Sequence, residues 1–106
     1  MREYKHKIGS HAKRGYSFQL ALMNKIFERD GGMCIYCGAP AMEIDHVIPL
    51  KDGGPTISSN GVCCCRHCNR YKAHHPKDMD IITRAIFWLL QKGEDTSWMD
   101  NFYNKK

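Results

Sequence analysis

The sequence predicts a small α+β fold in which two short strands and a short helix are flanked by an N-terminal and a C-terminal helix. Apolar residues recur with helical spacing over residues 17–29 and 78–91, whereas residues 42–48 and 61–65 have the alternating or apolar character of strands. Two Cys-x-x-Cys pairs enclose this strand region. The 106 residues suffice for one small domain, and domains of this size often need a disulfide or a metal ion for stability.

The first long helix is predicted over residues 17–29. Phe18, Leu22 and Ile26 recur on one face of such a helix. Gly31-Gly32 provides its end, because glycine is a poor helix former and is common just past a helix C-terminus. We interpret the apolar face as part of the core.

The chain is basic, with a formal net charge of +5, which mildly favours a polyanionic partner. Residues 1–16 are rich in Lys, Arg and His, and we expect them to form an arm that contacts DNA phosphates. Residues 1–15 lack the apolar segment of an export signal, and no apolar run approaches the roughly 20 residues of a membrane span. We therefore expect a cytoplasmic protein with no membrane partner, in which paired cysteines bind metal.

Residues 42–48 and 61–65 are predicted to pair as two strands. The first alternates between polar and apolar side chains, and the second is mostly apolar. The connection between them, residues 49–59, is rich in Gly, Pro and Ser and is predicted to be a loop. A short helix is expected over residues 68–73, directly after the second strand.

The second long helix is predicted over residues 78–91. Asp78 and Asp80 favour its start, because carboxylates interact well with the partial positive charge of a helix N-terminus, and Lys92-Gly93 favours its end. Residues 85–90 are apolar almost all round the helix. We expect this segment to be well buried or to pack against a second copy of the chain, so the sequence is compatible with a homodimer.

Two Cys-x-x-Cys pairs predict a closed structural zinc site. Each pair presents two thiolates from a tight turn. Two pairs complete the tetrahedral coordination of one ion and leave no position for a substrate. A redox-active cysteine pair and an iron–sulfur cluster are the alternatives. The neighbouring Cys63 and Cys64 are interpreted as buried thiols that behave as small apolar side chains. The predicted zinc ligands are Cys34, Cys37, Cys65 and Cys68.

A second group of chemically active side chains lies between and beside the cysteine pairs. Asp45 and His46 are adjacent in the first predicted strand, Asn60 precedes the second, and Asn69 directly follows Cys68. An Asp-His dipeptide alone is a weak signal, because such pairs are common. The joint spacing of these residues with the cysteines carries the functional interpretation.

With these residues in place, the stretch from Cys34 to Lys72 resembles the HNH endonuclease family. The resemblance implies a ββα-metal fold, in which a two-stranded hairpin and a helix hold one divalent ion, and it implies cleavage of DNA phosphodiester bonds. The matching elements are Cys34-x-x-Cys37, Glu43-x-Asp45-His46-x-x-Pro49-Leu50, Gly53-Gly54, Asn60 and Cys65-x-x-Cys68-Asn69-x-x-Lys72.

The chemistry of the residue types fits this resemblance. A neutral imidazole suits the deprotonation of water beside a phosphodiester, so His46 is the predicted general base. Asp45 and Asn69 offer the hard oxygen ligands that Mg²⁺ or Mn²⁺ prefers. Adjacent residues of a strand point in opposite directions, so Asp45 can face the ion while His46 faces the water. Asn60 resembles the family residue that orients the imidazole and ties down the loop.

The residues around this group have predicted roles of their own. Some family members carry a His where this chain has Asn69 and a further His four residues on, where this chain has Ala73. The site therefore resembles the Asn-ended subclass, which favours Mg²⁺ or Mn²⁺ over a late transition metal. Glu43 is expected either to support the metal ligands or to be a solvated strand residue. The predicted DNA contacts are Arg66, Arg70 and Lys72.

The sequence thus predicts a metal-dependent DNA endonuclease that nicks one strand per active site. We expect residues 1–16 to be the basic arm and residues 17–106 to be the nuclease domain, with residues 34–73 as its core. A zinc-stapled DNA-binding module without catalysis is the alternative, and a redox or zinc-buffering protein is a third class. By analogy with small free-standing members of the family, we expect a phage or mobile-element origin in a bacterial host and a partner such as a phage packaging motor.

Overall fold

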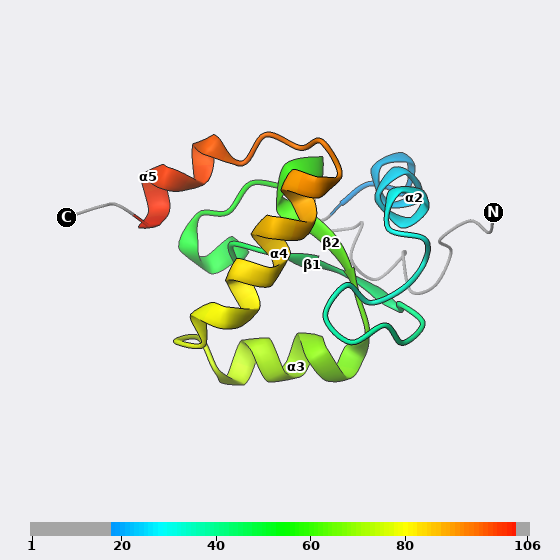
Figure 1. The fold of residues 1–106 in the computed structure, drawn as a ribbon, viewed down its shortest axis with the longest axis horizontal. Helices are drawn as coiled ribbons and strands as arrows, with labels where there is room; N and C mark the ends of the chain where they lie inside the picture. Colours follow the sequence, from blue (N-terminus) through cyan, green and yellow to red (C-terminus); the bar gives the residue numbers. More distant parts are fainter. Residues whose placement is uncertain (1–17, 104–106) are drawn as a thin grey trace.

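A pair of antiparallel strands forms the centre of the fold in a computed structural model, which describes residues 18–103 (Figure 1). Strand β1 spans Glu43–His46 and strand β2 spans Gly61–Cys64, with Glu43 opposite Cys64 and His46 opposite Gly61. Both strands lie inside the predicted segments and are shorter at their ends. The predicted basic arm, residues 1–16, lies outside the described residues.

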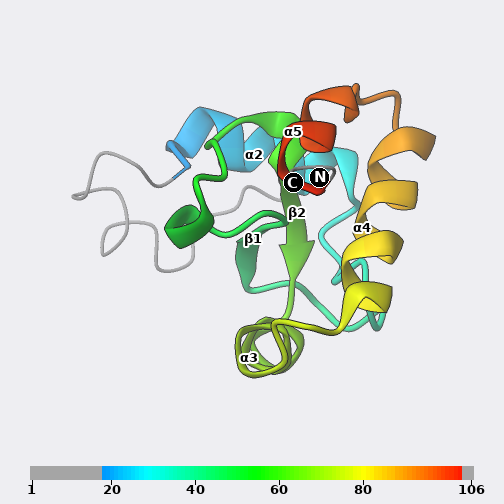
Figure 2. The same ribbon diagram turned by 90° about the vertical axis from the view of Figure 1, so that its left-hand side faces the viewer.

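Two helices contact the strand pair from different sides. Helix α2 spans Leu20–Arg29 and packs on β2, whereas helix α3 spans Arg66–His74 and contacts β1. Figure 2 shows α3 nearly end-on below the strand pair, while α2 lies near the upper end of the strands. The ββα arrangement expected from the sequence is therefore present, and the chain has the predicted small α+β fold.

The apolar face of α2 builds the first part of the core. Met23, Ile26 and Phe27 of this helix are buried, together with Phe18 just before it and Cys63 of β2. The helix ends where predicted, because Gly31 and Gly32 both adopt positive φ angles, 73° and 71°, that other residues rarely tolerate.

Helix α4, which spans Met79–Gln91, closes the other side of the fold. Its Ala85 and Leu89 are fully buried in a cluster with Val47, Ile48, Val62 and Met99. Phe87 and Leu90 are 63% and 50% exposed, so the helix is buried on one face only. The homodimer that the apolar segment suggested stays a prediction.

The chain after α4 turns back over the domain. A short 3₁₀ turn, Ser97–Met99, leads into helix α5, Asp100–Tyr103. Trp98 donates a hydrogen bond from Nε1 to Ser59 Oγ at 2.8 Å, which attaches this segment to the loop between the strands. No helix within residues 18–103 has the length and apolar character needed to cross a membrane.

The connection between β1 and β2 is held by the buried side chain of Asn60. Its Oδ1 accepts a hydrogen bond from the Ile48 amide at 2.8 Å, and its Nδ2 donates to the carbonyls of Ile48 and Pro55. Gly54 fits against the same backbone, since a Cβ atom there would overlap the Ile48 carbonyl. The Asn60 amide therefore satisfies buried backbone groups that the two-stranded sheet leaves unpaired.

A buried ion pair joins the end of α2 to three other segments. Arg29 pairs with Asp30 at 2.7 Å and donates to the carbonyls of Ser58 and Gly61. Asp30, 5% exposed, also accepts hydrogen bonds from the Cys63 amide and the Trp88 indole. This pair links α2, β2, the interstrand loop and α4.

We expect Asp30→Ala to destabilise the domain by about 3 kcal/mol, because it removes the carboxylate that pairs with Arg29 and leaves the Cys63 amide and the Trp88 indole without their acceptor. Denaturant unfolding of the zinc-loaded protein measures this loss. Glu28→Ala is the matched control, since Glu28 is exposed on the same helix, and its effect should stay within about 0.5 kcal/mol. Equal stability of the two variants would contradict the role of Asp30.

Candidate active site

The sulfur atoms of the four predicted zinc ligands lie together at the junction of the 34–37 turn and the start of α3. All four Sγ atoms lie within 4.8 Å of one another, and those of Cys37 and Cys65 are 3.7 Å apart. Zinc–sulfur bonds of about 2.3 Å in a tetrahedron place sulfurs about 3.8 Å apart, so this donor set fits a zinc ion. All six cysteines are free thiols. Cys34, Cys37, Cys65 and Cys68 could therefore hold a metal ion in a closed site.

Local backbone geometry favours ionisation of one of these thiols, that of Cys34. The Cys34 amide donates to the Ala39 carbonyl, and the Gly38 amide returns a hydrogen bond to the Cys34 carbonyl at 2.8 Å, which closes the turn. Burial of Cys34 opposes ionisation, but hydrogen bonds from the backbone at Cys65, Cys37 and Tyr36 outweigh it and lower the pKa of its thiol to about 7. The chain therefore favours a thiolate at this position.

Cys63 and Cys64 lie outside the four-sulfur cluster. Both are fully buried, and their thiols face the backbone carbonyls of Ile26 and Cys65. Burial raises the pKa of Cys63 to about 12 and also raises that of Cys64, so both remain neutral thiols. Their interpretation as small buried side chains agrees with this environment.

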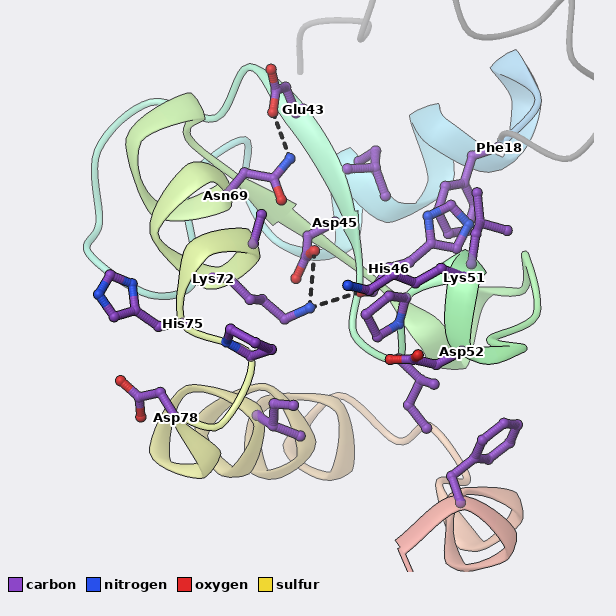
Figure 3. Close-up of a pocket in the computed structure, with 18 of the residues that line it drawn as sticks. Phe18, Glu43, Asp45, His46, Lys51, Asp52, Asn69, Lys72, His75 and Asp78 are labelled. Atoms are coloured by element: carbon purple, nitrogen blue, oxygen red, sulfur yellow. Dashed lines mark hydrogen bonds and ion pairs between the residues drawn. The ribbon is translucent and has the colours of Figure 1, made fainter.

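A cleft of about 830 Å³ opens along β1 and is walled by α3, the start of α4 and the C-terminal segment (Figure 3). Its polar lining includes Asp45 and His46 from β1 and Asn69 and Lys72 from α3. Three of the four predicted catalytic residues therefore meet in one cavity. The fourth, Asn60, is fully buried behind it.

Asp45 is held by two donors at the bottom of this cleft. It is 5% exposed, its Oδ2 accepts the Tyr36 hydroxyl at 2.8 Å, and its Oδ1 lies 3.3 Å from Lys72 Nζ. Burial raises the pKa of Asp45, while the charge of Lys72 acts in the opposite direction. Lys72 also donates to the His46 carbonyl at 3.0 Å. It is buried between β1 and α3 rather than exposed beside the two arginines, and its contact with DNA stays a prediction.

His46 points away from Asp45, as the alternation of strand side chains predicted (Figure 3). Its ring packs on Phe18, with the ring centroids 4.3 Å apart, and its Nε2 lies 3.0 Å from Thr56 Oγ1. Burial, together with the positive charge of Lys72, lowers the pKa of His46 to about 4, so the imidazole is neutral near pH 7. A neutral imidazole is the form that a general base requires.

The residue that contacts the imidazole differs from the predicted one. Asn60 was expected to orient the ring, but both polar atoms of its side-chain amide bond to the loop backbone, at Ile48 and Pro55. The hydroxyl of Thr56 makes the contact with the ring instead. The side chain of Asn60 thus makes the loop-holding contacts that were predicted for it, and these contacts fix the loop that carries Thr56.

Asn69 is oriented by Glu43. Its Nδ2 donates to Glu43 Oε1 at 2.6 Å, and Arg66 lies 3.5 Å from the other carboxylate oxygen of Glu43. Because Nδ2 is used in this way, Oδ1 of Asn69 is left on the side of Asp45 (Figure 3). Of the two roles open to Glu43, this contact supports the one beside the metal ligands. Asp45 and Asn69 are the residues that could hold a divalent ion here.

The remaining basic residues of α3 are at the surface. Arg66 and Arg70 are exposed, as a role in DNA contact requires. His74 and His75 are exposed as well, and His75 stacks on Tyr71 with the ring centroids 3.9 Å apart. His75 also lines the cleft, whereas His74 does not.

Comparison with known proteins gives matches that centre on this site. The family model described as HNH endonuclease matches residues 34–75. The type IV methyl-directed restriction enzyme EcoKMcrA of Escherichia coli (strain K12) is 33% identical in an alignment of 72 positions, which covers 58% of this chain and 26% of that protein. The chain therefore spans about a quarter of the length of this curated relative. No solved structure gives a significant match.

We expect Cys37→Ala to abolish cooperative folding, although Cys37 is exposed and its removal leaves no cavity. In a small domain, binding energy at a structural zinc site is folding energy. Native mass spectrometry should find one zinc per chain in the wild type and none in the variant, and circular dichroism should show the loss of the folded state. Cys64→Ala is the control and should retain its zinc. A Cys37→Ala protein with unchanged melting would contradict the zinc assignment.

Proposed function

We propose that this chain, whose residues 34–75 belong to the HNH endonuclease family, is a metal-dependent endonuclease that hydrolyses phosphodiester bonds of DNA. The observation that carries the proposal is the placement of Asp45 and His46, which leave one strand in opposite directions and line one cleft. The oxygen of Asn69 lies on the Asp45 side of the same cleft. The similarity to a methyl-directed restriction enzyme supports DNA as the substrate.

In the proposed reaction His46 is the general base that takes a proton from the attacking water. In the tautomer whose Nε2–H donates to Thr56, the other ring nitrogen, Nδ1, keeps the lone pair that accepts this proton. The low pKa of the buried ring supports this role, because it keeps the imidazole unprotonated at neutral pH.

Asp45 and Asn69 would hold the catalytic ion, with waters that complete its coordination. Their hard oxygen donors fit Mg²⁺ or Mn²⁺. Such an ion, when bound, stabilises negative charge on the phosphate and on the leaving oxygen. Glu43 keeps the amide of Asn69 oriented, and Tyr36 and Lys72 keep the carboxylate of Asp45 oriented. A zinc ion held by the four cysteines would have no free position and would act on structure alone.

The DNA backbone would approach the cleft beside α3. Arg66, Arg70 and Lys72 are the proposed phosphate contacts on this helix, and residues 1–16 are the proposed arm. One active site cuts one strand, so a monomer would nick DNA. The exposed side chains of Phe87 and Leu90 support a homodimer as the route to a double-strand break.

The wider biological setting is proposed by analogy with small proteins of the family. We infer a cytoplasmic enzyme of a bacterial host that is encoded by a phage, a prophage or another mobile element. A packaging motor or another mobile-element protein would then direct the cut. The free state of all six cysteines agrees with a reducing compartment.

The test is relaxation of supercoiled plasmid with Mg²⁺ or Mn²⁺. The wild type should nick, and His46→Ala should lower the rate at least about 100-fold, because a positioned base contributes that much or more. His74→Ala is the control, since this exposed histidine does not line the cleft, and it should cut like the wild type. A wild type that binds DNA but never cuts would favour a zinc-stapled binding module. A His46→Ala protein with full activity would refute the assignment of the base.

We further expect Thr56→Val to lower the turnover rate about 10-fold, because the variant keeps the side-chain volume and loses the hydroxyl that contacts His46. Thr56→Ser should restore most of the rate. Plasmid nicking at saturating Mg²⁺ measures both variants, and Thr83→Val, an exposed change on α4, is the control. A Thr56→Val enzyme with the wild-type turnover rate would show that the contact does not matter for catalysis.

A further inference from the structure

The turn that carries the first pair of zinc ligands also touches the proposed catalytic carboxylate. Tyr36 lies between Cys34 and Cys37, and its hydroxyl donates a hydrogen bond to Asp45 Oδ2 at 2.8 Å. The turn itself does not need this hydroxyl, because backbone hydrogen bonds between Cys34, Gly38 and Ala39 close it. The phenol group therefore has a partner in the active site and none in the turn.

This hydrogen bond determines which oxygen of Asp45 faces the cleft. The Tyr36 hydroxyl occupies Oδ2, so Oδ1 is the oxygen that meets Lys72 (Figure 3). Asp45 is almost fully buried, and these two donors are the contacts that fix the rotation of its carboxylate. Without the Tyr36 hydroxyl, only Lys72 would fix the rotation of the Asp45 carboxylate. Oδ2 would then be buried without a hydrogen-bond donor.

A purely structural role for Tyr36 would depend on its ring. The ring is packed beside the core cluster of Val47 and Val62 and beside the zinc-binding cysteines. Tyr36→Phe preserves this packing and removes only the hydroxyl. The variant therefore separates a packing role from an effect on Asp45.

We propose that Tyr36 is a positioning residue through which the zinc-binding turn sets the affinity of Asp45 for the catalytic divalent ion. This inference rests on the proposed function, since it takes Asp45 as a ligand of that ion. Zinc fixes the backbone on both sides of Tyr36, and the hydroxyl passes that constraint to the carboxylate. The two metal sites are then coupled, so an ordered zinc site strengthens binding at the second site without contact with the substrate.

The experiment measures Mn²⁺ binding to the zinc-loaded protein without DNA, by electron paramagnetic resonance of free Mn²⁺. Binding that persists in Asp45→Ala is subtracted as nonspecific. Tyr36→Phe should retain one zinc per chain and weaken the Asp45-dependent binding about 10-fold, as changes beside metal ligands commonly do. The matched control is Tyr71→Phe, which removes an exposed hydroxyl bonded to Asp78 and should bind Mn²⁺ like the wild type.

A measurement on the unmutated protein does not depend on the folding of any variant. With tyrosines labelled at the ring ζ carbon, addition of Mg²⁺ should shift the resonance of Tyr36 and leave that of Tyr71 in place. A Tyr36 resonance that ignores Mg²⁺, or a folded Tyr36→Phe protein with unchanged Mn²⁺ affinity, overturns the inference.

Failure of the proposed function can be distinguished from failure of this inference. A wild type that shows Tyr36-dependent Mn²⁺ binding at Asp45 but cuts no DNA would refute the nuclease and support the coupling. A wild type that nicks DNA while Tyr36→Phe binds Mn²⁺ normally would support the nuclease and refute the coupling. In the nicking assay the coupling predicts a split effect for Tyr36→Phe, in which the Mn²⁺ concentration for half-maximal rate rises about 10-fold while saturating Mn²⁺ restores most of the rate.

Discussion

The connection between the 34–37 turn and the first turn of α3 is the constraint on which the site depends. Cys65 directly follows β2 and caps α3, and its sulfur lies 3.7 Å from that of Cys37. A two-stranded sheet is only marginally stable by itself, so the angle between β1 and α3 needs another source of rigidity. An ion bound by the four sulfurs would supply it and would thereby hold Asp45 on β1 near Asn69 on α3. In the proposed enzyme the four cysteines would then set the geometry of the site without taking part in the chemistry.

A second constraint acts on the other side of β1. The loop between the strands returns over the end of β1, and Asn60 fixes its path through hydrogen bonds to Ile48 and Pro55. Thr56, the residue after Pro55, is thus carried to His46. The carboxylate and the imidazole of one dipeptide are therefore oriented by different parts of the chain. The zinc-binding turn acts on Asp45, and the loop anchored by Asn60 acts on His46.

The parts of this structure that follow from local patterns were predictable from the sequence. The positions of the strands, of α2 and of α4 follow from the period of their apolar residues, and the four sulfurs follow from the spacing of the cysteines. The partners of the active-site residues depend on the path of loops and on side-chain direction, which have no period. Nothing in the sequence near Tyr36 or Thr56 distinguishes them from other hydroxyl residues. The sequence also left open whether one side of α4 is exposed, because an apolar pattern does not distinguish a buried face from an exposed one.

Lys72 lies on the predicted face of α3, but packing gives it a different partner from the predicted one. Its position three residues after Asn69 put it on the right face of α3, but the approach of α3 to β1 buries its ammonium group against Asp45. A buried carboxylate without a counter-charge would cost several kcal/mol, and the pair with Lys72 offsets much of that cost. The ion pair therefore keeps Asp45 in place before any divalent ion arrives. Under the proposed function the two metals would have separate tasks: a zinc ion would be needed for folding, and the catalytic ion would bind to a site that the protein has already formed.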